Sequence, residues 1–236
     1  MTNNTFQYQE LLAITATLRG KDGCPWDKAQ THESTKPHLL EEAYEVHQAI
    51  SDLTATGNPD HLIEELGDLL FQIVLHAQIA EEEGEFTMDD VVDRLCRKMI
   101  HRHPHVFKGQ AYDSVEEQQA DWEKLKSEEQ GHISDSAREE LRAVPAAFPA
   151  LIRGQKIAKK AARSQMISGS EMDIFRDLLQ SVLELGTAPT KEQKTGAVGL
   201  SRSLGKTLFA LCRFAQAHGL SAEEALIDEI EESFLR

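Results

Sequence analysis

The chain has 236 residues, enough for one large or two small domains with hydrophobic cores. Its formal net charge of -15 excludes a general nucleic-acid binder, because such proteins present a basic surface to the phosphate backbone. Aromatic residues make up 6% of the chain and charged residues 28%, and the abundance of Leu, Ala and Glu favours a helical protein.

The three cysteines are widely scattered, which predicts neither a disulfide framework nor a zinc knuckle and favours a reducing compartment. Residues 1–10 are polar and lack the apolar core of a signal peptide. No apolar run approaches the roughly 20 residues that cross a bilayer. We therefore expect a cytoplasmic protein that binds neither nucleic acid nor membrane.

Helical periodicity dominates the chain, and no segment alternates as a strand would, so the sequence predicts an all-α protein. Capping boxes at Thr87–Asp90 and Ser114–Glu117 open two helices, and Pro104 forces an exit from the helix near His103. The helices expected in the first half are residues 6–19, 34–53, 61–83, 88 to about 103 and 114 to about 129.

A polar segment containing Gly131 and Pro145 is expected to be a linker between two domains. We place the domains at residues 1–129 and 148–236, with the linker at 130–147. The helices expected after the linker are residues 151–163, 171–185, 200–218 and 221–235, with a loop at 187–199.

Two of the expected helices each carry an i, i+3 pair of carboxylates on one face, Glu42 with Glu45 and Glu65 with Asp68. Each pair borders an apolar stripe, and Glu41 precedes the first pair. Carboxylates beside a core are costly unless a positive charge lies between them. The pattern predicts a site for a hard divalent cation, although single Glu pairs on helices are more often solvated.

Such a metal site would need basic groups if its substrate carried phosphates. Lys98 and Arg102 form an i, i+4 pair at the end of the next helix and can supply them, or can simply be cations favoured by the helix dipole. The chain has no glycine-rich phosphate loop, so metal-bound phosphate chemistry here points to hydrolysis rather than to kinase-like transfer.

The chain also contains an internal repeat. Leu66-Gly67-x-x-Leu70-Phe71-x5-Ala77-Gln78 recurs, at one constant offset, as Leu204-Gly205-x-x-Leu208-Phe209-x5-Ala215-Gln216. The matching helical phase indicates a duplication. In the second copy Ser203 replaces Glu65 and Lys206 replaces Asp68, so the packing residues are kept and the acids are lost.

Five segments in order carry a resemblance to a known family: Gly23-Cys24-Pro25-Trp26-Asp27, Gln30-Thr31-His32-Glu33-Ser34, Leu40-Glu41-Glu42-Ala43-Tyr44-Glu45, Glu64-Glu65-Leu66-Gly67-Asp68-Leu69-Leu70-Phe71 and Arg102-His103-Pro104-His105-Val106-Phe107. Together they cover nearly all of residues 6–127, and 149–157 extend the match. The chain resembles the MazG nucleoside triphosphate pyrophosphohydrolases, whose signature is E-x-x-E, a spacer and E-x-x-D.

The resemblance implies two repeated all-α domains whose helical bundles are completed in a homodimer. It also implies Mg²⁺-dependent cleavage of nucleoside triphosphates to monophosphate and pyrophosphate, with Mn²⁺ as an alternative metal. The roles that it implies are metal binding by Glu42, Glu45, Glu65 and Asp68, water activation by Glu41 and Glu42, phosphate binding by Lys98 and Arg102, and a base pocket shaped by Trp26.

The second half departs from the family pattern. Residues 180–184 stand where E-E-x-x-E would be, and of the four metal-ligand positions only Glu184 is acidic. Glu231 and Glu232 lie where basic residues are expected. We therefore expect only the first domain to bind metal, and Lys206 to place its ammonium where a metal would stand.

Other readings stay open at this point. The protein is either an active pyrophosphohydrolase, a hydrolase specialised for damaged or alarmone nucleotides, or a non-catalytic member that binds nucleotide or a partner. Trp26 is also compatible with a core or interface role, and His101, His103 and His105 raise a weaker zinc alternative.

Overall fold

The computed structural model describes residues 5–129, 137–187 and 196–235. All regular structure in these ranges is helical and none of it is strand, which confirms the predicted all-α fold. The chain divides into two compact units, Met1–Leu125 and Lys126–Arg236. No helix within the described ranges is both long and apolar enough to cross a membrane.

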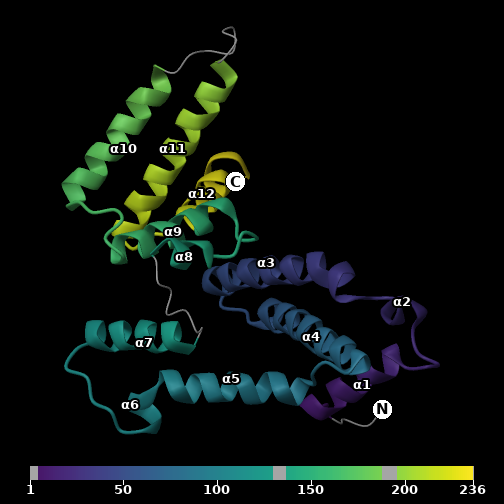
Figure 1. Cartoon of the computed structure of the whole chain (residues 1–236). Helices are drawn as coiled ribbons and strands as arrows, with labels where there is room; N and C mark the ends of the chain where they lie inside the picture. The colour runs from purple at the N-terminus through teal and green to yellow at the C-terminus, as the bar shows by residue number, and fades with distance from the viewer. Residues whose placement is uncertain (1–4, 130–136, 188–195, 236) are drawn as a thin grey trace. The chain divides into compact units, whose positions relative to one another are not determined.

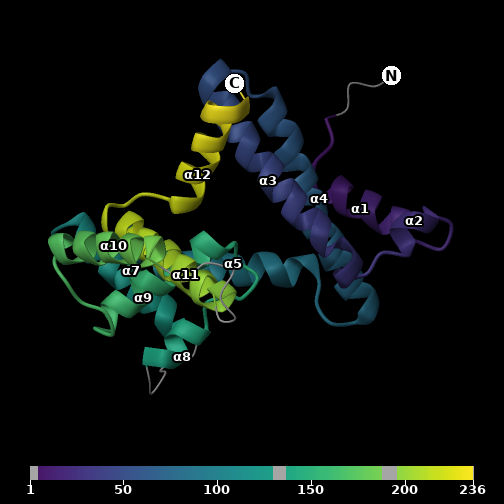
Figure 2. The ribbon, with the colours of Figure 1, turned by 90° about the horizontal axis from the view of Figure 1, so that it is seen from above.

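The first unit is organised around an antiparallel pair of long helices, α3 (His32–Thr56) and α4 (Asp60–Glu83), which lie side by side in Figures 1 and 2. Gly57 ends α3 with a φ of 72°, a left-handed conformation that glycine adopts without strain. The other helices of this unit are α1 (Tyr8–Arg19), α2 (Pro25–Lys28), α5 (Met88–Arg102), α6 (Pro104–Phe107) and α7 (Val115–Glu129), the last of which continues past Leu125.

Helix α3 begins two residues earlier than predicted because a capping box precedes it. The Thr31 side chain accepts a hydrogen bond from the Ser34 amide, and the Ser34 hydroxyl accepts one from the Thr31 amide at 2.9 Å. Buried Ala49 marks the face of α3 that packs on α4, where Val74, Leu75 and Ile79 are also buried. Glu45 lies one turn and Glu42 two turns before Ala49, so both belong to this face.

The segment between α1 and α3, where no helix was predicted, contains the short helix α2, which has Pro25 in its first turn. The chain before it passes very close to the end of α1, where the Cys24 amide donates to the Leu18 carbonyl at 2.8 Å. A Cβ at Gly23 would lie 2.2 Å from that same carbonyl oxygen. Glycine is therefore required at position 23, which explains its place in the first sequence segment.

Arg19 joins three parts of the first unit, a role that its place in the sequence did not reveal. Its buried guanidinium donates to the carbonyls of Asp27 at 2.6 Å and Gln30 at 3.1 Å. It also forms a salt bridge with Glu82 of α4 at 2.8 Å. The hydrogen bond from Arg19 holds the pKa of Glu82 below its usual range.

The second unit contains a helical hairpin of its own. Helix α10 (Glu171–Gly186) packs against α11 (Gly196–Ala217), and α9 (Ala150–Arg163) packs on α11 (Figure 1). The packing of α9 on α11 is close, since a Cβ at Gly154 would lie 2.8 Å from the Cys212 sulfur. The chain continues in α12 (Ala222–Ile230) and ends in a π-helical turn over Glu231–Leu235, where one α-helix was predicted for 221–235.

The segment proposed as a linker is partly helical. Residues 130–136 lie outside the described part of the chain, and α8 (Ala137–Arg142) occupies the following residues and packs against α9. Of the predicted loop 187–199, residues 188–195 likewise lie outside the described part, and α11 begins at Gly196.

Replacing Arg19 with Met should lower the free energy of unfolding by roughly 2–4 kcal/mol, because two backbone carbonyls and a carboxylate lose a buried charged donor. Urea unfolding followed by circular dichroism measures this loss. Because the folded pKa of Glu82 is lowered, its contribution is present above about pH 4.3 and disappears as the pH falls through the folded value. The difference in the free energy of unfolding between wild type and the Arg19→Met variant should therefore become smaller at acidic pH.

Arg97→Met is the matched control, since Arg97 is an exposed arginine paired with Asp93 one turn away on α5. Its loss should stay below about 0.5 kcal/mol. Equal losses for the two variants would contradict the joining role of Arg19.

Candidate functional site

The α3–α4 hairpin brings three of the predicted metal ligands together. Glu42 and Glu45 of α3 and Glu65 of α4 each offer a carboxylate oxygen, and these oxygens all lie within 4.8 Å of one another. We call these three residues the acidic group. The pairing of helix faces explains the arrangement, because the i, i+3 pair on α3 faces one turn of α4.

The electrostatics of the acidic group show how closely its members interact. Burial, followed by the negative charges of Asp68, Glu45 and Glu65, raises the pKa of Glu42 above its usual range. Asp68 lies outside the three-residue group but is near enough to act on Glu42. The four predicted ligands therefore share one region of negative potential, at a cost to the fold.

The acidic group fits a hard divalent cation. Its donors are carboxylate oxygens, which Mg²⁺ prefers, and in the described ranges no Lys or Arg forms an ion pair with Glu42, Glu45 or Glu65. A bound dication would supply the missing positive charge. The acidic group thus provides the oxygen donors and the uncompensated negative charge that a Mg²⁺ site requires.

His61 is a site residue that the sequence reasoning missed. Its Nε2 lies 3.1 Å from Glu65 Oε1, and its Nδ1 lies 3.0 Å from Asp52 Oδ2. Hydrogen bonds from Gln48, and then from His61, lower the pKa of Asp52. The i, i+4 spacing of His61 and Glu65 is visible in the sequence, but Asp52 joins them only because the end of α3 meets the start of α4.

Glu41 lies outside the acidic group. Its carboxylate Oε2 lies 2.9 Å from Nδ1 of His38, and the side chain is mostly exposed. The indole ring of Trp26 lies 6.5 Å from the His38 ring, measured between centroids, and is 61% exposed. Trp26 therefore lies beside α3 one turn before Glu42, with an open aromatic face.

The structure does not join the predicted basic pair to the acidic group. The Arg102 guanidinium lies over the Trp122 ring, 5.5 Å from its centroid, and Lys98 is half-buried one turn earlier on α5. The described residues contain no ion pair between either cation and Glu42, Glu45 or Glu65. The side chains of His101, His103 and His105 do not form a ligand cluster in the described part of the chain.

The second unit holds an ion pair in its own hairpin. Lys206 Nζ of α11 lies 3.3 Å from Glu184 Oε2 of α10. Hydrogen bonds from Gln180 and Lys206, and the positive charge of Lys206, lower the pKa of Glu184. The buried Thr207 hydroxyl donates to the Ser181 carbonyl at 3.0 Å and ties the two helices together. The Lys206 ammonium thus lies opposite Glu184, the one acid among the four positions where metal ligands were expected.

Comparisons with known proteins agree with these features. Residues 30–107 match the MazG nucleotide pyrophosphohydrolase domain. A nucleoside triphosphate pyrophosphohydrolase of Escherichia coli K12 is 37% identical over 225 residues, which cover 93% of this chain and 81% of that protein. The nucleoside triphosphate pyrophosphohydrolase/pyrophosphatase MazG of Thermotoga maritima is 35% identical over 219 residues, covering 93% and 79%.

A third relative, the uncharacterized protein YabN of Bacillus subtilis, is 44% identical over 153 residues, which are 65% of this chain and 30% of that protein. The similarity to the Escherichia coli and Thermotoga maritima proteins reaches across both units, beyond the residues that match the domain.

Replacing Glu42 with Gln should stabilise the metal-free protein at pH 7 by roughly 0.5–1 kcal/mol, because it removes one of several mutually repelling carboxylates. The raised pKa of Glu42 sets the sign: metal-free wild type loses stability as the pH rises through that value, and the variant does not. Thermal unfolding in chelator, at several pH values, measures the effect.

Adding Mg²⁺ should raise the melting temperature of wild type more than that of the Glu42→Gln variant. Glu64→Gln is the control, since Glu64 is an exposed neighbour of Glu65 outside the acidic group. If Glu64→Gln and Glu42→Gln stabilised the metal-free protein equally, general surface charge would explain the result instead.

Proposed function

This chain belongs to the MazG family of nucleotide pyrophosphohydrolases, and on that premise we propose that its first unit is the catalytic one. It hydrolyses nucleoside triphosphates to nucleoside monophosphate and pyrophosphate. Glu42, Glu45, Glu65 and Asp68 bind Mg²⁺, with Mn²⁺ as an alternative. The observation that carries the proposal is the acidic group, which has His61 beside Glu65 but no Lys or Arg partner within the described residues.

A bound Mg²⁺ would neutralise phosphate charge and lower the pKa of the attacking water. The residues of the chain then have distinct tasks. Glu42 lies within the acidic group and can accept the proton that the water gives up. Glu41 is the second candidate base, and its contact with His38 gives a route for that proton to leave.

The remaining predicted residues bind substrate in this proposal. Lys98 and Arg102 contact the phosphates, and the exposed ring of Trp26 stacks on the base. Helix α4 supports a homodimer, since Ile63, Leu66, Leu70 and Ile73 form an exposed apolar stripe at helical spacing. A second copy of the chain would cover this stripe and extend the helical bundle.

The ion pair between Lys206 and Glu184 supports the assignment of metal binding to the first unit alone. Because the second unit has lost most of its metal ligands, a second candidate function is that the protein binds nucleotide or a partner without turnover. A hydrolase for damaged or alarmone nucleotides would use the same residues and differ in its base pocket.

Incubation of the full chain with a panel of nucleoside triphosphates and Mg²⁺ should yield monophosphate and pyrophosphate. Glu42→Gln and Asp68→Asn should each lower the rate on the order of 100-fold or more, because each removes a metal ligand. Glu64→Gln and Lys206→Met should leave the rate within about twofold of wild type. Anion-exchange chromatography identifies the products.

Diphosphate and phosphate as products would overturn the proposed reaction. Saturable nucleotide binding without turnover would favour the non-catalytic alternative. A large loss of rate in the Lys206→Met variant, with the fold intact, would contradict the assignment of catalysis to the first unit.

Replacing His61 with Ala should raise the Mg²⁺ concentration needed for half-maximal rate by roughly 10- to 100-fold, because Glu65 loses the group that orients it. The rate at saturating Mg²⁺ should fall much less. His61→Gln should recover part of the affinity through its amide donor, and His47→Ala, an exposed site on α3, should change nothing. An equal fall in rate at all Mg²⁺ concentrations would contradict the orienting role.

A further inference from the structure

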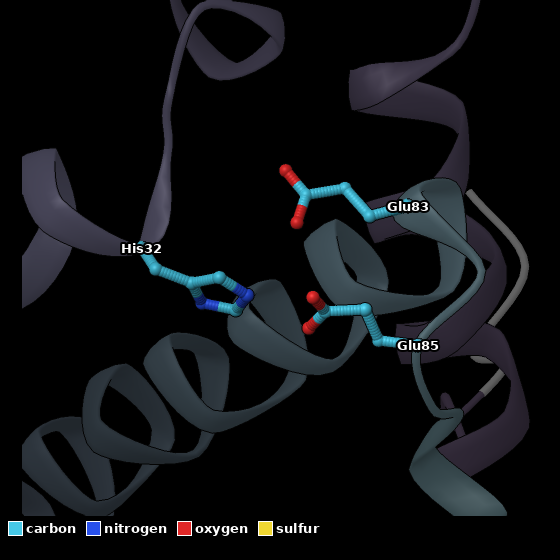
Figure 3. A group of neighbouring side chains, drawn as sticks. All are labelled: His32, Glu83 and Glu85. Atoms are coloured by element: carbon cyan, nitrogen blue, oxygen red, sulfur yellow. The ribbon is translucent and has the colours of Figure 1, made fainter.

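A second group of ligating side chains lies at the other end of the α3–α4 hairpin. His32 is the first residue of α3, Glu83 is the last residue of α4, and Glu85 follows two positions later. One ligand atom from each of the three lies within 4.8 Å of the others. In Figure 3 the His32 ring points toward the Glu85 carboxylate, and the Glu83 carboxylate lies beside the same space.

This group is separate from the acidic group. Glu65 and Glu83 are about five turns apart on α4, or roughly 27 Å at 1.5 Å per residue. The donor set also differs, since it combines an imidazole nitrogen with two carboxylates. Mg²⁺ avoids nitrogen ligands, whereas Zn²⁺ and other first-row transition dications accept imidazole and carboxylate together.

The hydrogen bonds behind His32 fix which of its nitrogens is available. The Thr35 hydroxyl lies 3.0 Å from the Thr31 carbonyl, its closest acceptor, and 3.4 Å from His76 Nε2, and we therefore assign it as donor to Thr31 and acceptor from His76 Nε2. His76 Nδ1 is then left without a proton. It accepts from His32 Nδ1, 2.7 Å away.

The proton on Nδ1 leaves the Nε2 lone pair of neutral His32 free, and Figure 3 shows this outer ring nitrogen directed toward Glu85. A lone pair facing two carboxylates is unfavourable unless a cation lies between them. A histidine that donates its other N–H to a fixed acceptor is the usual arrangement around protein-bound metal. His76 is thus the orienting partner of His32.

The surroundings offer no other cation to the two carboxylates. Among the described residues neither Glu83 nor Glu85 forms an ion pair, while their neighbour Glu82 is paired with Arg19. Gly84 ends α4 in the left-handed conformation, with a φ of 73°, and allows the chain to turn between Glu83 and Glu85. The C-terminal end of α4 adds the negative end of its helix dipole.

We propose that His32, Glu83 and Glu85 bind a transition-metal dication of the Zn²⁺ type, with His76 as the positioning residue behind His32. The ion joins the start of α3 to the end of α4. It therefore clamps the hairpin at the end remote from the acidic group. Three protein ligands leave a fourth coordination position for water.

Zn²⁺ binding to the full chain tests the site. Competition with a chromophoric chelator, in excess Mg²⁺ to occupy the oxygen-only acidic group, should detect one Zn²⁺ per chain. His32→Gln, and Glu83→Gln combined with Glu85→Gln, should each weaken binding by at least tenfold, and His76→Phe by roughly 10- to 100-fold. His47→Gln and Glu81→Gln are the matched controls, an exposed histidine on α3 and an exposed acid on α4, and should bind as wild type does.

A measurement on the wild-type chain guards against variants that misfold. Nitrogen-15 spectra of the histidine rings should show the His32 Nε2 resonance shifting on addition of one equivalent of Zn²⁺, with Nδ1 remaining protonated. The proposal is overturned if wild type binds no Zn²⁺ in excess Mg²⁺, if His32→Gln binds as tightly as wild type, or if Zn²⁺ shifts other histidines and leaves His32 unchanged.

Discussion

The close packing of α3 on α4 is the constraint on which the first unit depends. The two helices approach each other closely, and Ala49 of α3 and Val74 and Leu75 of α4 are buried. The same approach forces Glu42, Glu45 and Glu65 into one small region, where the neighbouring charges and burial raise the pKa of Glu42. Like charges held together by a hydrophobic interface destabilise the metal-free folded state, and a bound dication would remove this repulsion.

The second unit shows that this hairpin does not need the acids. Helices α10 and α11 pack in the same way while Ser203 and Lys206 stand at the repeated positions, and Lys206 pairs with Glu184. A covalently attached ammonium supplies positive charge without a metal. The hairpin of the second unit is thus built without these acids, which supports the chemical role proposed for the carboxylates of the first unit.

The surroundings of the first hairpin are held by polar contacts rather than by a deep core. Buried Arg19 ties the end of α1 and the α2 segment to Glu82, and so fixes the short helix that carries Trp26. His61 links the end of α3 to Glu65 at one end of the hairpin, and His76 links α4 to His32 at the other. Directional hydrogen bonds thus set side-chain orientation at both ends, where apolar packing alone would leave it free.

The sequence by itself determined the helical class, the helix starts at the capping boxes of Thr87 and Ser114, and the placing of Glu42 with Glu45 and of Glu65 with Asp68 on single helix faces, because helical periodicity, capping residues and i, i+3 spacing are local properties of the chain. It did not determine the direction of Glu41, whose carboxylate lies against His38, or the contacts of Arg102, which lies over Trp122. Nor did it reveal Arg19, His61 or the His32–Glu83–Glu85 group. Each of them depends on a partner on another helix or beyond a turn, Glu82 for Arg19, Asp52 for His61 and Glu83 for His32, and only the tertiary packing of α1, α3 and α4 brings these charges and lone pairs within reach of one another.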